Sequence, residues 1–365
     1  MPLVSMERML EATRLTRAGR LMEATALLRG QEPTTSQPDM APPGSPVIDM
    51  VPPLTPDGSW SVQRAHHSDQ TPPAGKGSFK AHIYRGPEGA RAYKLYVPAG
   101  EPGSSRPLIV MLHGCTQSPD DFATGTGMNQ LADQHGMLIA YPAQSQSANA
   151  QKCWNWFQAK DQKRAGGEPA IIAAITRRIV DEYAVDKDRV YIAGLSAGGA
   201  AAAVMGEVYP DIFAAVGVHS GLACGAARDM TTAFTAMRAG GNDLPTRSPE
   251  RGARFVPTIL FHGDRDATVH PVNGEQVLAQ SRAASERLAA EQTSGTAPGG
   301  LRYTVTVEVN IQGQPVLEHW LVHGAGHAWS GGSAAGSYTE PRGPDASREM
   351  VRFFLANARN RTGQS

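Results

Sequence analysis

Between about residues 78 and 358, segments with a strand-like pattern of apolar residues alternate with segments that have a helix-like pattern. The first two segments have period-two alternation, which predicts antiparallel strands over 79–85 and 91–98. Later runs are almost continuously apolar, as in parallel strands buried on both faces; they cover 107–114, 137–143, 190–196, 214–220 and 256–263. Helical patterns occupy the intervals at 119–135, 168–184, 197–208 and 273–291. Two more strands are expected at 303–312 and 316–323, and a last helix near 345–358.

This alternation predicts an α/β domain over 78–358, with a mostly parallel central sheet flanked by helices on both faces. Good helix formers dominate residues 1–30, which we expect to be a helical extension. That extension either contacts a partner such as a polymer granule or folds onto its own domain. Ten of the 27 prolines fall within 31–77, which predicts a poorly ordered linker, and 359–365 would be a C-terminal tail.

Composition narrows the possible partners. The 34 basic and 34 acidic side chains cancel, which argues against nucleic acid or an anionic membrane surface as a partner. No run approaches the roughly 20 apolar residues that a membrane span needs. Charges interrupt the N-terminal segment, so no signal peptide is evident; this favours a cytoplasmic protein, with a secreted or periplasmic one as the alternative. The three cysteines lack the spacing of a metal site, and no metal is expected.

The strongest chemical signal is Gly194-Leu195-Ser196-Ala197-Gly198. A Gly-x-Ser-x-Gly pattern is weak alone, but here a buried strand enters it and an Ala-rich helix leaves it, as a nucleophile elbow requires. Glycines on both sides allow a turn this tight. Ser196 would then present its hydroxyl at a helix N-terminus, where the dipole favours a developing negative charge.

A serine nucleophile needs a base, and the base needs an orienting carboxylate. In this arrangement the acid and then the histidine follow the serine along the chain. Asp264 and Asp266 both follow a predicted strand, and we favour Asp266 because the next residues can fold back and bury it. His327 lies in a glycine-rich loop just past a strand and is the predicted base, whereas His319 and His323 are expected to be structural.

Acyl transfer also needs donors for the oxyanion. The backbone N–H of Ala197 should provide one, and the loop after strand 107–114 should provide the other, from Cys115. His113 is then a supporting residue. Cys153 lies in another loop at the same end of the sheet; a Cys115–Cys153 bridge would rigidify the oxyanion loop but conflicts with a reducing cytoplasm, so both states stay open. Cys224 is expected to be a buried thiol.

Taken together, these blocks resemble the polyhydroxybutyrate-depolymerase family of esterases, within the α/β-hydrolase superfamily. The segments that carry the resemblance are LHGCTQSPDDFATGTGMNQLADQHGMLIAYP, CWNWF, VYIAGLSAGGAAA, HGDRDATV and GAGHAWSGG. The resemblance implies a triad of Ser196, Asp266 and His327 with a Cys115 oxyanion amide. It also implies esters of 3-hydroxyalkanoates as substrates, in polymers or oligomers; the relatives of this family include feruloyl and acetylxylan esterases.

We therefore expect a serine esterase that forms an acyl-enzyme and needs no metal or organic cofactor. Without an evident signal peptide or a polymer-adsorbing module, soluble oligomers, amorphous polyester or small acyl esters are the expected substrates. Trp156 and Trp329 are candidate substrate contacts because a Trp face suits a polyester repeat or an aromatic acid, while Trp154 should pack internally. The alternatives are a feruloyl or acetylxylan esterase and a catalytically silent binding protein.

Overall fold

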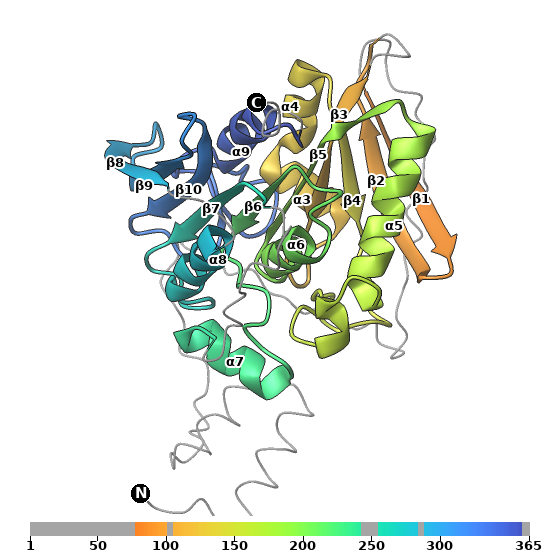
Figure 1. Ribbon diagram of the computed structural model, residues 1–365, viewed down its shortest axis with the longest axis horizontal. Coiled ribbons are helices and arrows are strands. Elements are labelled where there is room, and N and C mark those ends of the chain that lie inside the picture. The colour runs from red at the N-terminus through yellow and green to blue at the C-terminus, as the bar shows by residue number, and fades with distance from the viewer. Residues whose placement is uncertain (1–76, 101–104, 242–254, 284–287, 360–365) are drawn as a thin grey trace, which may run out of the picture. The chain divides into compact units, whose positions relative to one another are not determined.

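The computed structural model describes residues 77–100, 105–241, 255–283 and 288–359 (Figure 1). The expected N-terminal extension over 1–30 and nearly all of the expected linker lie outside these residues. None of the helices in the described ranges combines the length and the apolar composition that crossing a membrane requires.

A ten-stranded sheet forms the centre of the described structure, in the order β1-β2-β4-β3-β5-β6-β7-β10-β9-β8. The strands from β4 to β10 in this order are parallel, and antiparallel strands extend the sheet at both sides. The parallel strands are the long apolar runs of the sequence, buried on both faces. The bounds of all ten strands are β1 (Ser78–Gly86), β2 (Gly89–Val97), β3 (Arg106–Leu112), β4 (Leu138–Pro142), β5 (Val185–Leu195), β6 (Ala215–His219), β7 (Thr258–Gly263), β8 (Ala289–Thr296), β9 (Arg302–Val309) and β10 (Pro315–Val322).

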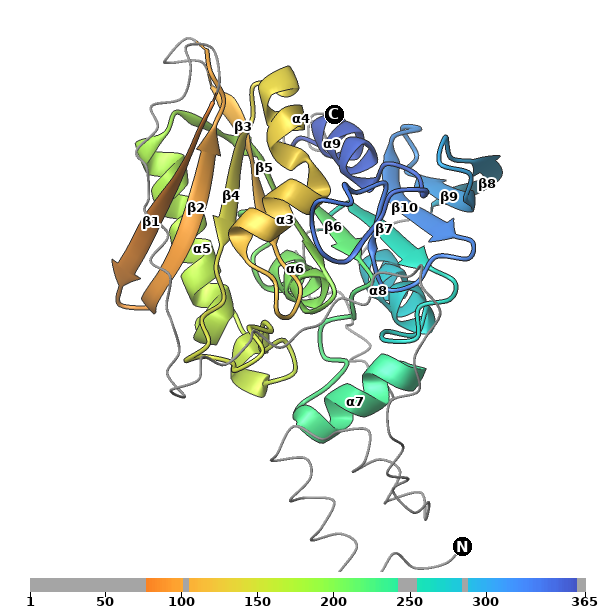
Figure 2. The ribbon, with the colours of Figure 1, turned by 180° about the vertical axis from the view of Figure 1, so that it is seen from behind.

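Helices cover both faces of this sheet, as Figures 1 and 2 show from opposite sides. One face carries α5 (Gly167–Glu182), α6 (Ala197–Val208) and α8 (Val272–Ala283). The other carries α3 (Pro119–Thr126), α4 (Met128–His135) and α9 (Ala346–Ala356). Each layer forms its own apolar core against the sheet. The predicted layered α/β architecture is therefore confirmed.

Three local predictions differ from the structure. The helix expected over 119–135 is interrupted by Gly127, whose φ of 63° ends α3 and precedes α4. The helix expected over 273–291 ends at Ala283, and Ala289–Thr296 instead forms the edge strand β8, because pairing with β9 outweighs the local helix preference. Helix α7 (Met230–Ala239) was not predicted, although Asp229 and Thr232 form a capping box at its start.

Candidate active site

Ser196 lies in the tight turn between β5 and α6. Its φ of 58° and ψ of −120° are strained for a residue with a side chain. The turn is possible because of its glycines: a Cβ at Gly194 would overlap the carbonyl of Gly198, and a Cβ at Gly198 would overlap the carbonyl of Leu112. The Ser196 N–H donates to the carbonyl oxygen of His219 over 2.9 Å, which ties the turn to the end of β6. The sequence thus builds the elbow geometry that its motif predicts.

Asp266 and His327 come together from two loops that are 61 positions apart. The Nδ1 of His327 lies 2.7 Å from Oδ2 of Asp266. Oδ1 of Asp266 accepts hydrogen bonds from the backbone N–H groups of Thr268 (2.9 Å) and Val269 (2.8 Å), the fold-back that the sequence suggested. Burial alone would raise the pKa of Asp266, but hydrogen bonds from His262 and His327 hold that pKa well below its usual range. Asp266 is therefore an ionised, buried partner for the imidazole of His327.

Asp264, the alternative acid, is paired with a different histidine. Its Oδ2 lies 3.0 Å from Nδ1 of His323, and its Oδ1 accepts from the N–H of Gly324 over 2.7 Å. Nε2 of His323 lies 2.8 Å from the hydroxyl of Thr304. This second pair ties the loop after β7 to the loop after β10, the same two loops that hold Asp266 and His327. The expectation of a structural role for His323 agrees with these contacts.

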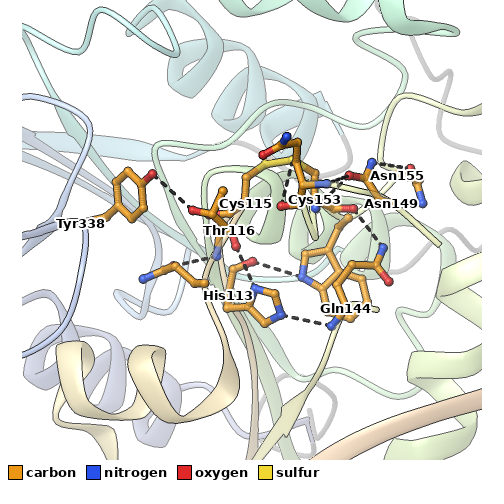
Figure 3. Close-up of a disulfide and its surroundings, with 12 residues drawn as sticks. His113, Cys115, Thr116, Gln144, Asn149, Cys153, Asn155 and Tyr338 are labelled. Atoms are coloured by element: carbon orange, nitrogen blue, oxygen red, sulfur yellow. Dashed lines mark hydrogen bonds between the residues drawn. A yellow bond between two sulfur atoms is a disulfide. The ribbon is translucent and has the colours of Figure 1, made fainter. Parts of the chain in front are cut away.

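The loop after β3 passes beside Ser196. A Cβ added at Gly114 would lie 3.7 Å from the Cβ of Ser196. Cys115 follows, and it forms a disulfide with Cys153 (Figure 3). Among the described residues, neither the N–H of Cys115 nor the N–H of Ala197 has a backbone or side-chain acceptor. Backbone N–H groups without a protein acceptor beside a serine nucleophile can stabilise an oxyanion, so Cys115 and Ala197 stay the predicted donors.

His113 supports this loop from below. Its Nε2 accepts the N–H of Gln144 over 3.1 Å, so its Nδ1–H donates to the carbonyl oxygen of Gly114 over 2.7 Å. Burial lowers the pKa of His113 to about 4, which keeps this imidazole neutral at pH 7. Trp154 is fully buried, as expected, and its indole N–H donates to the carbonyl oxygen of His113 over 3.1 Å. These contacts fix the backbone on which Cys115 lies.

His219 is a site residue that the sequence analysis missed. Its carbonyl accepts from Ser196, and its Nε2 accepts the backbone N–H of Ser330 over 2.9 Å. The ring stacks on Trp329 with a centroid distance of 5.1 Å. Burial lowers the pKa of His219 to about 3, so the imidazole is neutral. His219 therefore connects the Ser196 turn, through its backbone carbonyl, to the loop that carries His327, through its buried side chain. Its position at the carboxyl end of a buried strand was the available signal.

The two tryptophans proposed as substrate contacts are buried. Trp329 is 1% exposed: it packs against Phe122 and His219, and its indole N–H donates to the hydroxyl of Ser347. Trp156 is 6% exposed and contacts Phe157 edge to face. Faces covered by protein cannot receive a polyester repeat, so the structure contradicts this expectation. In the described part of the chain, His, Cys, Asp and Glu side chains form no group of three or more that could hold a metal ion.

Known proteins resemble this chain in sequence and in structure. A family model described as Esterase PHB depolymerase matches residues 91–297. Poly(3-hydroxyalkanoate) depolymerase C of Paucimonas lemoignei is 33% identical over 242 residues, which cover 64% of this chain and 57% of that protein. Poly(3-hydroxybutyrate) depolymerase of Ralstonia pickettii is 29% identical over 255 residues, covering 66% and 52%. The chain thus spans about half the length of these relatives.

A feruloyl esterase B of Thermothelomyces thermophilus is 29% identical over 221 residues, which cover 56% of this chain and 74% of that protein. Among solved structures, an acetyl xylan esterase from Aspergillus awamori superposes with a TM-score of 0.57 at 20% identity. That superposition covers 76% of this chain and 99% of the other. At this identity the likeness concerns the fold.

Proposed function

Since the chain belongs to the polyhydroxybutyrate-depolymerase family of esterases and has the α/β-hydrolase fold, we propose that it is a serine esterase acting through an acyl-enzyme. Its proposed substrates are esters of 3-hydroxyalkanoates, in polymers or oligomers. The observation that carries the proposal is the 2.7 Å hydrogen bond between Asp266 and His327, which leaves Nε2 of His327 as the basic nitrogen. Contact of residues 1–30 with a polymer granule stays a prediction, because these residues lie outside the described structure.

In the proposed reaction, Nε2 of His327 takes the proton of the Ser196 hydroxyl as its oxygen attacks the ester carbonyl. The carbonyl oxygen becomes an anion and accepts hydrogen bonds from the N–H groups of Cys115 and Ala197, worth about 3–4 kcal/mol per donor. The imidazolium returns its proton to the leaving alcohol, and the acyl group stays on Ser196. Water then gives a proton to Nε2 of His327 as its oxygen attacks the acyl carbon. The tetrahedral anion collapses, the bond to the Ser196 oxygen breaks, and the imidazolium returns the proton to that oxygen as the acid leaves. Asp266 stays ionised and stabilises the imidazolium throughout.

A feruloyl or acetylxylan esterase is the second candidate. The sequence match to feruloyl esterase B covers 74% of that protein, against 57% and 52% of the two depolymerases, which supports this alternative. The same triad would serve both reactions, so only the substrate separates them. The disulfide supports the secreted or periplasmic localisation over the cytoplasmic one, because reducing compartments disfavour such bonds.

The test is a hydrolysis panel with the wild-type protein and Ser196→Ala. We expect release of 3-hydroxybutyrate from its soluble oligomers and from amorphous polymer, together with hydrolysis of short p-nitrophenyl esters, all abolished by Ser196→Ala. Hydrolysis of methyl ferulate or acetylated xylan without activity on the oligomers would replace the first candidate with the second. No turnover of any ester would leave the catalytically silent binding protein.

A further inference from the structure

Two residues with unfavourable backbone conformations contact each other beside the proposed oxyanion loop. Thr116 has a φ of 66° and Tyr338 a φ of 51°, in segments 222 positions apart. Their hydroxyl oxygens lie 3.3 Å apart (Figure 3). Residues with side chains rarely adopt such values unless the surrounding structure imposes them, and they gather at functional sites. The fold therefore holds these two side chains in place at a cost in stability.

The backbone around Tyr338 is fixed from both sides. Before it, the N–H of Ser337 donates to Asp121 over 2.9 Å, and the carbonyl of Ser337 accepts from Gln117 over 3.1 Å. The carbonyl of Tyr338 itself accepts the N–H of Trp329 over 2.7 Å, where the short strands β11 (Trp329–Ser330) and β12 (Thr339–Glu340) pair. Tyr338 is thus held between the oxyanion loop and the loop that carries His327.

The strained conformation of Tyr338 does not serve to bury its side chain, because the residue is 46% exposed. The hydroxyl of Thr116 donates to the carbonyl oxygen of Cys115 over 2.6 Å, which uses its single proton. The Tyr338 hydroxyl is therefore the donor to Thr116. This bond places the tip of the ring on the residue next to Cys115, whose N–H is a proposed oxyanion donor. The residue nevertheless keeps nearly half of its surface open to solvent.

We propose that Tyr338 binds the ester substrate, and that its ring covers the hydroxyalkanoate unit next to the scissile ester. An aromatic face suits the methyl and methylene groups of such a unit, which carries no charge. The buried Trp156 and Trp329 cannot offer a face of this kind. This inference rests on the proposed function for the identity of the ligand. The experiment therefore measures binding separately from turnover.

Binding of the 3-hydroxybutyrate trimer is measured by calorimetry in a Ser196→Ala background. Adding Tyr338→Ala should weaken binding about tenfold, which corresponds to about 1.4 kcal/mol. Adding Tyr338→Phe should change it less than about twofold, because the ring stays and only the bond to Thr116 is lost. The matched control is Ile311→Ala, which removes another exposed apolar side chain (73% exposed), from the turn between β9 and β10, and should leave binding unchanged.

In the active protein, Tyr338→Ala should raise KM for the trimer about tenfold with kcat within about twofold. The kcat/KM for p-nitrophenyl acetate, which has no hydroxyalkanoate unit for the ring to cover, should stay unchanged. The inference is overturned if Ser196→Ala binds no trimer, if Tyr338→Ala binds as tightly as its parent, or if Tyr338→Phe is equally damaging. Parallel losses on both esters would mean that Tyr338 only braces the loops. Trimer binding that depends on Tyr338 without any hydrolysis would reject the proposed function and keep this inference.

Discussion

Removal of the Cys115–Cys153 disulfide should reduce both stability and rate. The bridge closes a segment with a sequence separation of 38, and it carries the backbone on which the Cys115 N–H lies. Replacing both cysteines by alanine avoids leaving an unpaired thiol that could form other bridges. The variant keeps the contacts of His113 beneath the loop, so the loop is loosened and the fold is retained.

The magnitude follows from the size of the closed segment. A crosslink over a separation of 38 removes about 13 cal/mol/K of entropy from the unfolded chain, or about 4 kcal/mol at 25 °C. For a domain of this size, about 4 kcal/mol corresponds to a decrease in Tm of roughly 8–16 °C. The largest decrease in kcat would be the one caused by complete loss of one oxyanion donor, which is about 100- to 1000-fold. We expect a smaller decrease, because other contacts still hold the loop.

Urea unfolding and p-nitrophenyl butyrate hydrolysis measure the two effects. Cys224→Ala is the matched control. Cys224 lies outside the disulfide and is half-buried, not buried as the sequence suggested, and its replacement should leave kcat unchanged. Thiol titration of the unfolded, unreduced wild-type protein should find one reactive thiol per chain, and three would refute the bridge itself. Equal stability and equal kcat in the double variant and the wild type would refute the reasoning about the loop.

Three further predictions follow from the site. Asp266→Asn should lower kcat by about 10⁴-fold, because the amide no longer holds the productive tautomer of the base. Asp264→Asn should lower kcat less than about tenfold. Equal losses of kcat in the two variants would contradict the assignment of Asp266 as the acid of the triad. His219→Phe keeps an aromatic ring but leaves the buried N–H of Ser330 without its acceptor. Urea unfolding should therefore show a free energy of unfolding lower by about 1–3 kcal/mol. An unchanged unfolding midpoint would argue against the contact between His219 and Ser330. Burial lowers the pKa values of His113 to about 4 and His219 to about 3, so protons bind preferentially to the unfolded chain below about pH 6.5. When the pH falls from 7.5 to 5, each of these two histidines should therefore lower the free energy of unfolding by about 2 kcal/mol. Equal unfolding midpoints at the two pH values would disprove this pH dependence.

The central sheet could be predicted because its strands are buried on both faces and appear as unbroken apolar runs. The edge strand β8 could not, because its residues are almost all exposed and its conformation comes from pairing with β9. The elbow at Ser196 could also be predicted from the sequence, because the turn requires glycines two positions away on each side. Asp266 could be preferred over Asp264 because the residues after it allow a backbone fold-back, which the structure contains.

Contacts between distant segments explain what the sequence did not show. The partner of His219 is Ser330, 111 positions away, and nothing in the sequence near His219 indicates that contact. The positive φ of Tyr338 likewise arises from neighbours in other loops. The sequence placed Trp156 and Trp329 in loops at the carboxyl ends of the strands, but it could not show which side of each ring is covered.

The most direct test of the central claim is covalent labelling of Ser196. The wild-type protein is incubated with a p-nitrophenyl organophosphonate, and the modified peptide is identified by mass spectrometry while residual esterase activity is measured. One phosphonyl group should attach to Ser196 in step with the loss of activity, and Ser196→Ala should stay unlabelled. Full inactivation with Ser196 unmodified would contradict the account.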